Sequence, residues 1–213
     1  MQTLNKKNSI IIAIVAIAGV FTAVIGVKAT GTSQTSTATI NATVMETMTL
    51  SCGNATIPNL TANTPQSVQA ACTATTNGAA GFNLKVHKTT AASDATKTLV
   101  NGTTWIVDTS AGLAAYDGTG STPALWTSGT TKGLGFRVQV SGTTNANALA
   151  YWAADGAGTA KYAAFPVADQ TVYNYASYAS AASAVTIDYK LDVPTTQMAG
   201  SYSGTVLYTA TTN

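Results

Sequence analysis

The chain has 213 residues, and only 8% of them are charged, against about 25% in an average soluble protein. Its formal net charge is +2 at pH 7. Loss of the three lysines among residues 1–29 would leave seven basic and eight acidic residues, a charge of −1. A near-neutral chain without a basic patch argues against nucleic acid and anionic membrane surfaces as partners.

Residues 1–29 have the layout of a secretory signal peptide. Lys6 and Lys7 precede an uncharged apolar run over residues 9–27, and small side chains follow around Ala29. We predict a hydrophobic signal helix that is cleaved after Ala29. The alternative is an uncleaved anchor, because about 20 apolar residues cross a bilayer. Residues 9–27 would then be the only membrane contact.

The exported part opens with a flexible Thr/Ser-rich segment, residues 30–36, and continues as a single predicted domain over residues 37–213. From residue 36 to Cys52 the even positions are mostly apolar and the odd ones mostly Thr, Asn or Ser. This period of two predicts one long strand with a buried face, which bends or bulges at Glu46.

The same alternation recurs along the chain and predicts an all-β fold. We predict strands around residues 68–74, 82–86, 134–140, 185–193 and 202–210. Turn signals lie at Asn77-Gly78, Asn101-Gly102, Asp117-Gly118 and Asp155-Gly156. The last two runs are predicted to pair as a closing hairpin over residues 189–210. No sustained helical period follows residue 27, so we expect about seven to nine strands in a two-sheet antiparallel β-sandwich.

Two stretches, residues 108–130 and 142–182, are less regular and are predicted to be long loops between strands. Most of the aromatic residues gather there. Such side chains either anchor loops to the core or form a platform for a ligand. The candidates for facing a ligand are Trp126, Tyr151, Trp152, Tyr173 and Tyr175.

The two cysteines, Cys52 and Cys72, are predicted to form a disulfide, because the chain has the features of an exported protein. Such a bridge would stabilise the fold by about 3 kcal/mol on the chain-entropy model. The alternative is two buried free thiols. A metal site is disfavoured, since the chain has one histidine and no second cysteine pair.

No group of residues suggests catalysis, and we predict neither an enzyme nor a cofactor. Acid–base chemistry needs titratable groups that converge, whereas the acidic residues here are scattered and His87 falls on the polar face of its strand. The sequence WIVDTSAG, with Asp108 at its centre, approaches an aspartic-protease motif but has Ser110 in place of glycine. The sequence YDGTGS offers a single carboxylate, too few for a calcium loop.

The order of these elements resembles that of secreted bacterial cell-surface β-sandwiches. The signal peptide, the Thr-rich strand into Cys52, the strand carrying Cys72 and the closing VPTTQMAGSYSGTVLYTA resemble two groups. One group is the pilin-like subunits of the spore-coat-U and chaperone-usher kind. The other is the WxL-like surface proteins, although Trp105-Ile106-Val107 has Val where that motif has Leu.

Each resemblance implies a different function. The pilin-like one implies an Ig-like sandwich whose Cys52–Cys72 bridge joins the first two strands. It also implies that residues 35–44, through Ile40, Ala42 and Val44, donate a strand to a neighbour's sheet edge. The WxL-like one implies a monomer held non-covalently at the cell wall. We therefore expect a secreted, non-enzymatic structural surface protein, a filament subunit that self-associates, with a wall- or glycan-binding adhesive module as the alternative.

Overall fold

A computed structural model of the chain describes residues 34–90, 96–109, 123–139, 152 and 159–213. The chain divides into two units, residues 1–43 and residues 44–213. In the first unit, residues 34–43 are exposed and have no regular secondary structure. The predicted signal peptide lies outside the described residues. Within the described part, no helix has the length and apolar character needed to cross a membrane.

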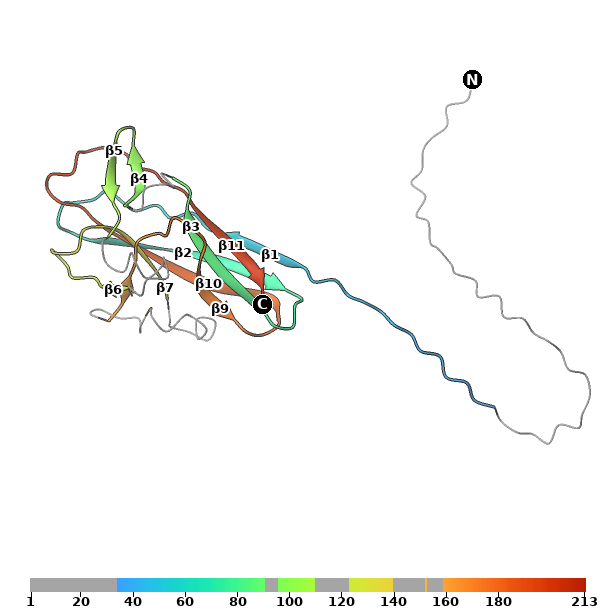
Figure 1. Ribbon diagram of the computed structural model, residues 1–213. Helices are drawn as coiled ribbons and strands as arrows, with labels where there is room; N and C mark the ends of the chain where they lie inside the picture. Colours follow the sequence, from blue (N-terminus) through green and yellow to red (C-terminus); the bar gives the residue numbers. More distant parts are fainter. Residues whose placement is uncertain (1–33, 91–95, 110–122, 140–151, 153–158) are drawn as a thin grey trace, which may run out of the picture. The chain divides into compact units, whose positions relative to one another are not determined.

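The second unit is built almost entirely from antiparallel strands (Figure 1). The strands are β1 (Met48–Cys52), β2 (Gln66–Thr76), β3 (Phe82–Lys88), β4 (Lys97–Asn101), β5 (Thr104–Val107), β6 (Ala124–Leu125), β7 (Gly133–Val138), β8 (Lys161–Tyr162), β9 (Gln170–Tyr175), β10 (Ala179–Asp192) and β11 (Val206–Thr212). The all-β prediction is confirmed, with eleven strands in the described residues.

Two larger sheets form the frame, one in the order β1-β2-β10-β7 and one in the order β11-β3-β9. The alternation in the sequence explains their strands. In β3, Phe82, Leu84 and Val86 are fully buried, whereas the residues between them are partly exposed. Side chains from both sheets belong to one hydrophobic core. Two small sheets, β4-β5 and β6-β8, complete the described part.

The closing hairpin prediction is wrong, because β10 and β11 belong to different sheets. The connection between them is held against the β4–β5 hairpin. Val100 and Ser203 exchange two backbone hydrogen bonds of 2.9 and 3.0 Å, and the Gln197 amide donates to the Trp105 carbonyl and to the Tyr202 hydroxyl. These contacts hold the connection that runs from β10 in the four-stranded sheet to β11 in the three-stranded sheet. Gln197 and Tyr202, which lie in the closing stretch VPTTQMAGSYSGTVLYTA, are thus part of the connection between the two sheets.

The long first strand is also wrong in its extent, since β1 begins only at Met48. Met48 pairs with Thr76, the last residue of β2, so none of the described strands pairs with the residues before Met48. The predicted buried face of residues 36–47 is exposed. Glu46 does not interrupt a strand but lies close to Gly78.

The region predicted as a long loop over residues 142–182 contains β8, β9 and the start of β10. Strand β9 escaped prediction because its register against β3 shifts between Leu84 and Lys85. Val172 and Tyr173, neighbours in sequence, are consequently both buried, which breaks the period of two. The Asn101-Gly102 turn joins β4 to β5 as expected, with Gly102 at a φ of +58°. The two Asp-Gly turns lie outside the described residues.

Candidate strand-exchange site

The edge formed by β1 and β11 differs from the edge formed by β7. β1 and β11 are the outermost strands of the two larger sheets on one side, and they lie close together without pairing. The outer side of β7 is covered, because Phe136 exchanges two hydrogen bonds with Ala163 and the Leu134 carbonyl accepts one from Thr109. An unpaired edge is a template for another strand.

Core-facing side chains along this edge are only half-buried. They are Met48, Leu50 and Cys52 on β1 and Val206, Tyr208 and Ala210 on β11, all packed against the core. In the central strand β3, by contrast, Phe82, Leu84 and Val86 have 0% exposure. The core is therefore closed at its centre and incomplete along the β1/β11 edge.

Two adjoining hollows open beside this edge. The smaller has a volume of about 330 Å³ and is lined by Cys52, Val206 and Tyr208, with the buried Leu134 and Phe165 also in its lining. The larger, about 830 Å³, is lined by the segment after β1 and the connection between β10 and β11. The two share four lining residues, Ala55, Ile57, Leu99 and Gly204. Buried core residues line both hollows, so an apolar side chain of another segment that entered them would contact the core.

The segment before β1, residues 34–47, is exposed throughout. Ile40 is 92% exposed, and Val44 and Met45 are each 82% exposed. The end of this segment is fixed by Asn77, whose side chain accepts a hydrogen bond from the Thr47 amide at 2.6 Å and donates one to the Met45 carbonyl at 2.9 Å. Residues up to Val44 thus precede an anchor point and keep their apolar side chains in solvent.

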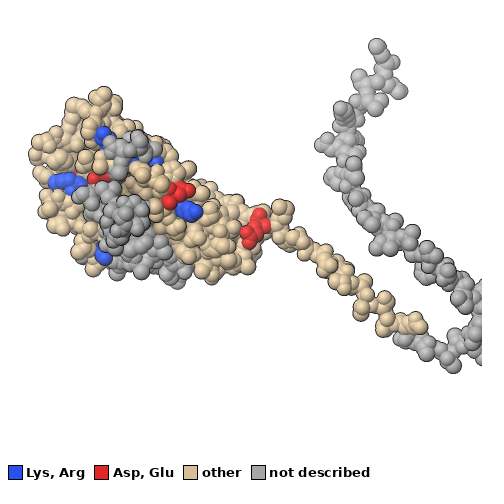
Figure 2. Space-filling model, in the orientation of Figure 1, with Lys and Arg blue, Asp and Glu red and all other residues tan. Residues whose placement is uncertain are grey.

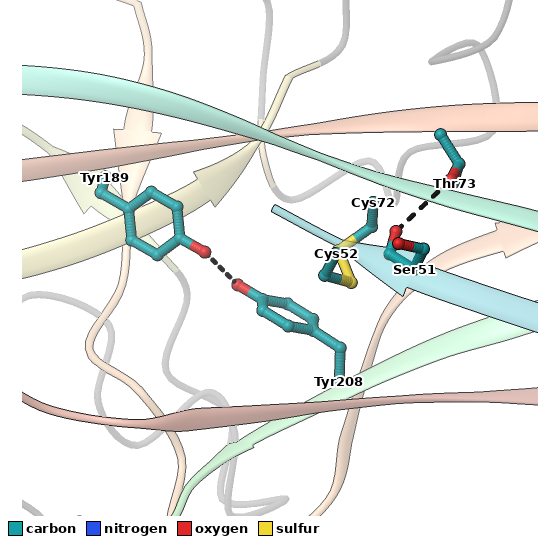
Figure 3. Close-up of a disulfide and its surroundings, with 6 residues drawn as sticks. All are labelled: Ser51, Cys52, Cys72, Thr73, Tyr189 and Tyr208. Carbon is teal, nitrogen blue, oxygen red and sulfur yellow. Dashed lines mark hydrogen bonds between the residues drawn. A yellow bond between two sulfur atoms is a disulfide. The ribbon is translucent and has the colours of Figure 1, made fainter. Parts of the chain in front are cut away.

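A disulfide between Cys52 and Cys72 ties β1 to β2 (Figure 3). The two residues are direct partners in the antiparallel register, with their Cα atoms 4.0 Å apart. The disulfide prediction is confirmed, and such a bond is typical of proteins in oxidising compartments.

A hydrogen bond between two tyrosines joins the two larger sheets near this disulfide (Figure 3). The hydroxyls of Tyr189 on β10 and Tyr208 on β11 lie 2.8 Å apart. Burial raises the pKa of both phenols.

The candidate ligand-facing aromatics do not form one surface. Trp152 and Tyr173 have 0% exposure, so for these two the expectation of facing a ligand is wrong. The physical reason is packing: the Trp152 ring packs against Phe136 and its Nε1 donates to the Val172 carbonyl at 3.0 Å.

The other three candidates lie in different places. Tyr175 is half-buried against Phe82, with ring centroids 5.7 Å apart. Trp126 is half-buried beside Tyr162, and Lys190 Nζ lies 5.5 Å from the Trp126 ring. Tyr151 lies outside the described residues. The structure therefore brings none of the described candidates together as an exposed platform.

Sequence reasoning missed a buried polar cluster around Lys88 and Asp108. Their side chains have 0% exposure, and Lys88 Nζ lies 3.0 Å from Asp108 Oδ2. Burial raises the pKa of Asp108, against the lowering effects of hydrogen bonds from Thr98 and of the Lys88 charge. A signal was present, because Lys88 continues the inward even positions of β3 and Asp108 follows the buried Ile106 by two residues. The carboxylate of the protease-like motif is thus buried and ion-paired.

Little else in the described part suggests chemistry. His87 Nδ1 lies 2.6 Å from Asp169 Oδ1 at the surface, and no group of three potential metal ligands occurs among the residues described. Acidic and basic side chains are few and scattered on the face drawn in Figure 2.

Neither a family model, nor a curated protein sequence, nor a solved structure matches this chain.

Proposed function

We propose that this chain is an exported, non-enzymatic structural protein of the cell surface, with an Ig-like, pilin-like two-layer sandwich fold, that assembles by strand exchange. Residues 38–44 of one copy pair with the β1/β11 edge of the next copy. The observation that carries the proposal is the coexistence of an exposed, alternating apolar segment and an incomplete core edge in the same chain.

The donor and the acceptor match in length and pattern. A strand rises about 3.3 Å per residue, so seven residues span about 23 Å. Residues 38–44 and β11 are both seven residues long. In an extended conformation Ala38, Ile40, Ala42 and Val44 share one face, which would enter the hollows, while Thr39, Asn41 and Thr43 would face solvent.

The low charge of the chain favours contacts between copies, because few charges need to be desolvated when subunits pack together. The disulfide fits the export that strand exchange at a cell surface requires. The anchor at Asn77 also refines the boundary of the donor. Residues 45–47 belong to the acceptor body, and the segment free to leave ends at Val44.

The test is deletion of residues 34–44 from the exported protein, keeping Met45, Thr47 and their contacts to Asn77. We expect the intact protein to form filaments or oligomers in negative-stain images and analytical ultracentrifugation, and the deletion variant to remain monomeric. A synthetic peptide of residues 35–44 should bind the deletion variant and raise its melting temperature.

Matched charge substitutions provide the control. Ile40→Asp should abolish assembly and peptide binding, because it places a charge on the buried face of the donor. Asn41→Asp adds the same charge one position away, on the solvent face, and should preserve both. Monomeric intact protein at high concentration, or equal effects of the two substitutions, would contradict strand exchange.

A further inference from the structure

The proposed assembly makes no use of the Lys88–Asp108 pair, which is unusual in its burial. Both side chains have 0% exposure. Removing two charged groups from water carries a desolvation penalty that their mutual attraction has to offset, and surface-exposed pairs avoid that penalty. A fully buried pair is therefore a candidate for a role beyond electrostatic attraction.

The surroundings distinguish the two carboxylate oxygens of Asp108. Oδ1 accepts a hydrogen bond from the Thr98 backbone amide at 3.1 Å. Oδ2 accepts hydrogen bonds from the Thr98 hydroxyl at 2.7 Å and from Lys88 Nζ at 3.0 Å. One oxygen thus has a fixed backbone donor, and the other has two side-chain donors. Lys88 Nζ also donates to the Lys97 carbonyl at 3.1 Å, which orients the amine.

Burial also favours the neutral form of the Asp108 carboxyl. The pKa of Asp108 is raised, mainly by desolvation. Transfer of one proton along the 3.0 Å hydrogen bond would convert the ion pair into a neutral amine and a carboxylic acid. These are the nucleophile and the electrophile of amide formation, and Cγ is one covalent bond from the oxygen that Nζ contacts.

We propose that Lys88 and Asp108 condense to form an intramolecular amide cross-link. Nζ attacks Cγ and a C–N bond forms. The Cγ–Oδ2 bond then breaks, and Oδ2 leaves as water with the two protons that Nζ loses. An ammonium and a carboxylate become an amide and one water, with no change of oxidation state and no co-reactant.

Thr98 holds the positions that assist this reaction. Its backbone amide faces Oδ1, where negative charge develops as Nζ attacks, and that oxygen becomes the carbonyl of the product. Its hydroxyl contacts Oδ2 and is placed to relay a proton to the departing oxygen. The product is favoured by its surroundings, because a neutral amide replaces two buried charges.

The cross-link would join the two larger sheets covalently. Lys88 ends β3 in the three-stranded sheet, whereas Asp108 forms a parallel bridge with Leu134 of β7 in the four-stranded sheet. The bond would close a loop with a sequence separation of 20 residues. Such a link resists pulling the sheets apart, whatever the assembly state of the protein.

Mass spectrometry of the folded, purified protein after prolonged incubation tests the proposal, and peptide mapping locates the bond. The mass of the intact protein should be lower by one water than the mass calculated from the sequence with its disulfide. Trypsin should fail to cut after Lys88 but should still cut after Lys97, so that residues 86–97 are released joined to residues 98–132. Fragment ions from two N-termini, at residues 86 and 98, distinguish this product from an uncut linear peptide 86–132 of the same mass. Separate peptides of unaltered mass would overturn the proposal. Because the wild-type protein itself is measured, poor folding of a variant does not affect this outcome.

Variants then separate the cross-link from a plain ion pair. Lys88→Met and Asp108→Ala should each have the full calculated mass. Asp108→Asn cannot form the ion pair, yet the same attack on its side chain would release ammonia. We expect the same two peptides to be joined, and the mass of the intact variant to be lower by one ammonia than the mass calculated from its sequence. The result does not depend on strand exchange, so either proposal can fail alone.

Discussion

The centre of the core and the β1/β11 edge use the same kinds of side chain but differ in closure. At the centre, Phe82, Leu84 and Val86 of β3 are fully buried between strands on both sides. At the edge, Leu50 and Tyr208 point toward the same core but remain half-buried. The difference teaches that alternation in a sequence specifies which face is apolar, whereas the presence of a neighbouring strand decides whether that face is covered.

The largest effect is expected at a fully buried side chain on β7, the strand whose outer side is covered. Phe136 stacks on Phe165 with ring centroids 4.2 Å apart and has no exposure. Phe136→Ala should lower the free energy of unfolding by about 3–5 kcal/mol, since it removes buried contacts and leaves a cavity. Denaturant titration of the wild type and the variant measures this. Leu207→Ala, at a position 48% exposed on β11, should cost far less. Equal losses at the two positions would contradict the contrast between the covered core and the β1/β11 edge.

The disulfide should be the main support of the edge. β1 has five residues, and β2 is its single partner among the strands that the structure describes. Replacing both cysteines by alanine should therefore cost about 3 kcal/mol and loosen β1. Denaturant titration gives the total, and hydrogen exchange should show faster exchange in β1 but unchanged protection in β7. Reducing agent should weaken the wild type and leave the double variant unaffected. A wild type insensitive to reduction would refute this role.

Sequence reasoning succeeded where local periodicity dominates. The inward residues of β2 and β3 alternate regularly, so these strands could be located without knowing their partners. The predictions failed where contacts with a segment distant in the sequence determine the structure. The start of β1 is set by the end of β2 at Thr76, and the separation of β10 from β11 is set by contacts to Val100 and Trp105.

The candidate site shows the same division. The alternating apolar pattern of Ile40, Ala42 and Val44 could be recognised in the sequence. The exposure of this segment and the open β1/β11 edge became evident only from the fold. Lys88 and Asp108 were readable as inward positions, yet the pairing of two residues 20 apart depends on how β3 and β5 are placed. Patterns in a sequence therefore identified segments, and tertiary contacts determined what those segments face.

The smallest expected effect concerns the tyrosine pair that joins the sheets at the edge. Burial raises the pKa of Tyr208 well above its ordinary value of 10.0, and the adjoining Tyr189 raises it further. Because the folded pKa is higher, the unfolded chain loses its phenolic protons first as the pH rises. The stability contributed by the pair is complete below pH 10 and is lost as the pH rises toward the folded value.

Tyr208→Phe should therefore have two effects. At neutral pH it removes the 2.8 Å hydrogen bond to Tyr189 and costs about 1 kcal/mol. Above pH 10 it should make the decline of the unfolding free energy shallower, because one phenol with a raised pKa is gone. Denaturant titrations from neutral to alkaline pH measure both. Tyr178→Phe, at a position 56% exposed, is the matched control and should alter neither. An unchanged alkaline slope in Tyr208→Phe would mean that this phenol ionises equally in both states, and that the edge is more open to water than its packing against the core indicates.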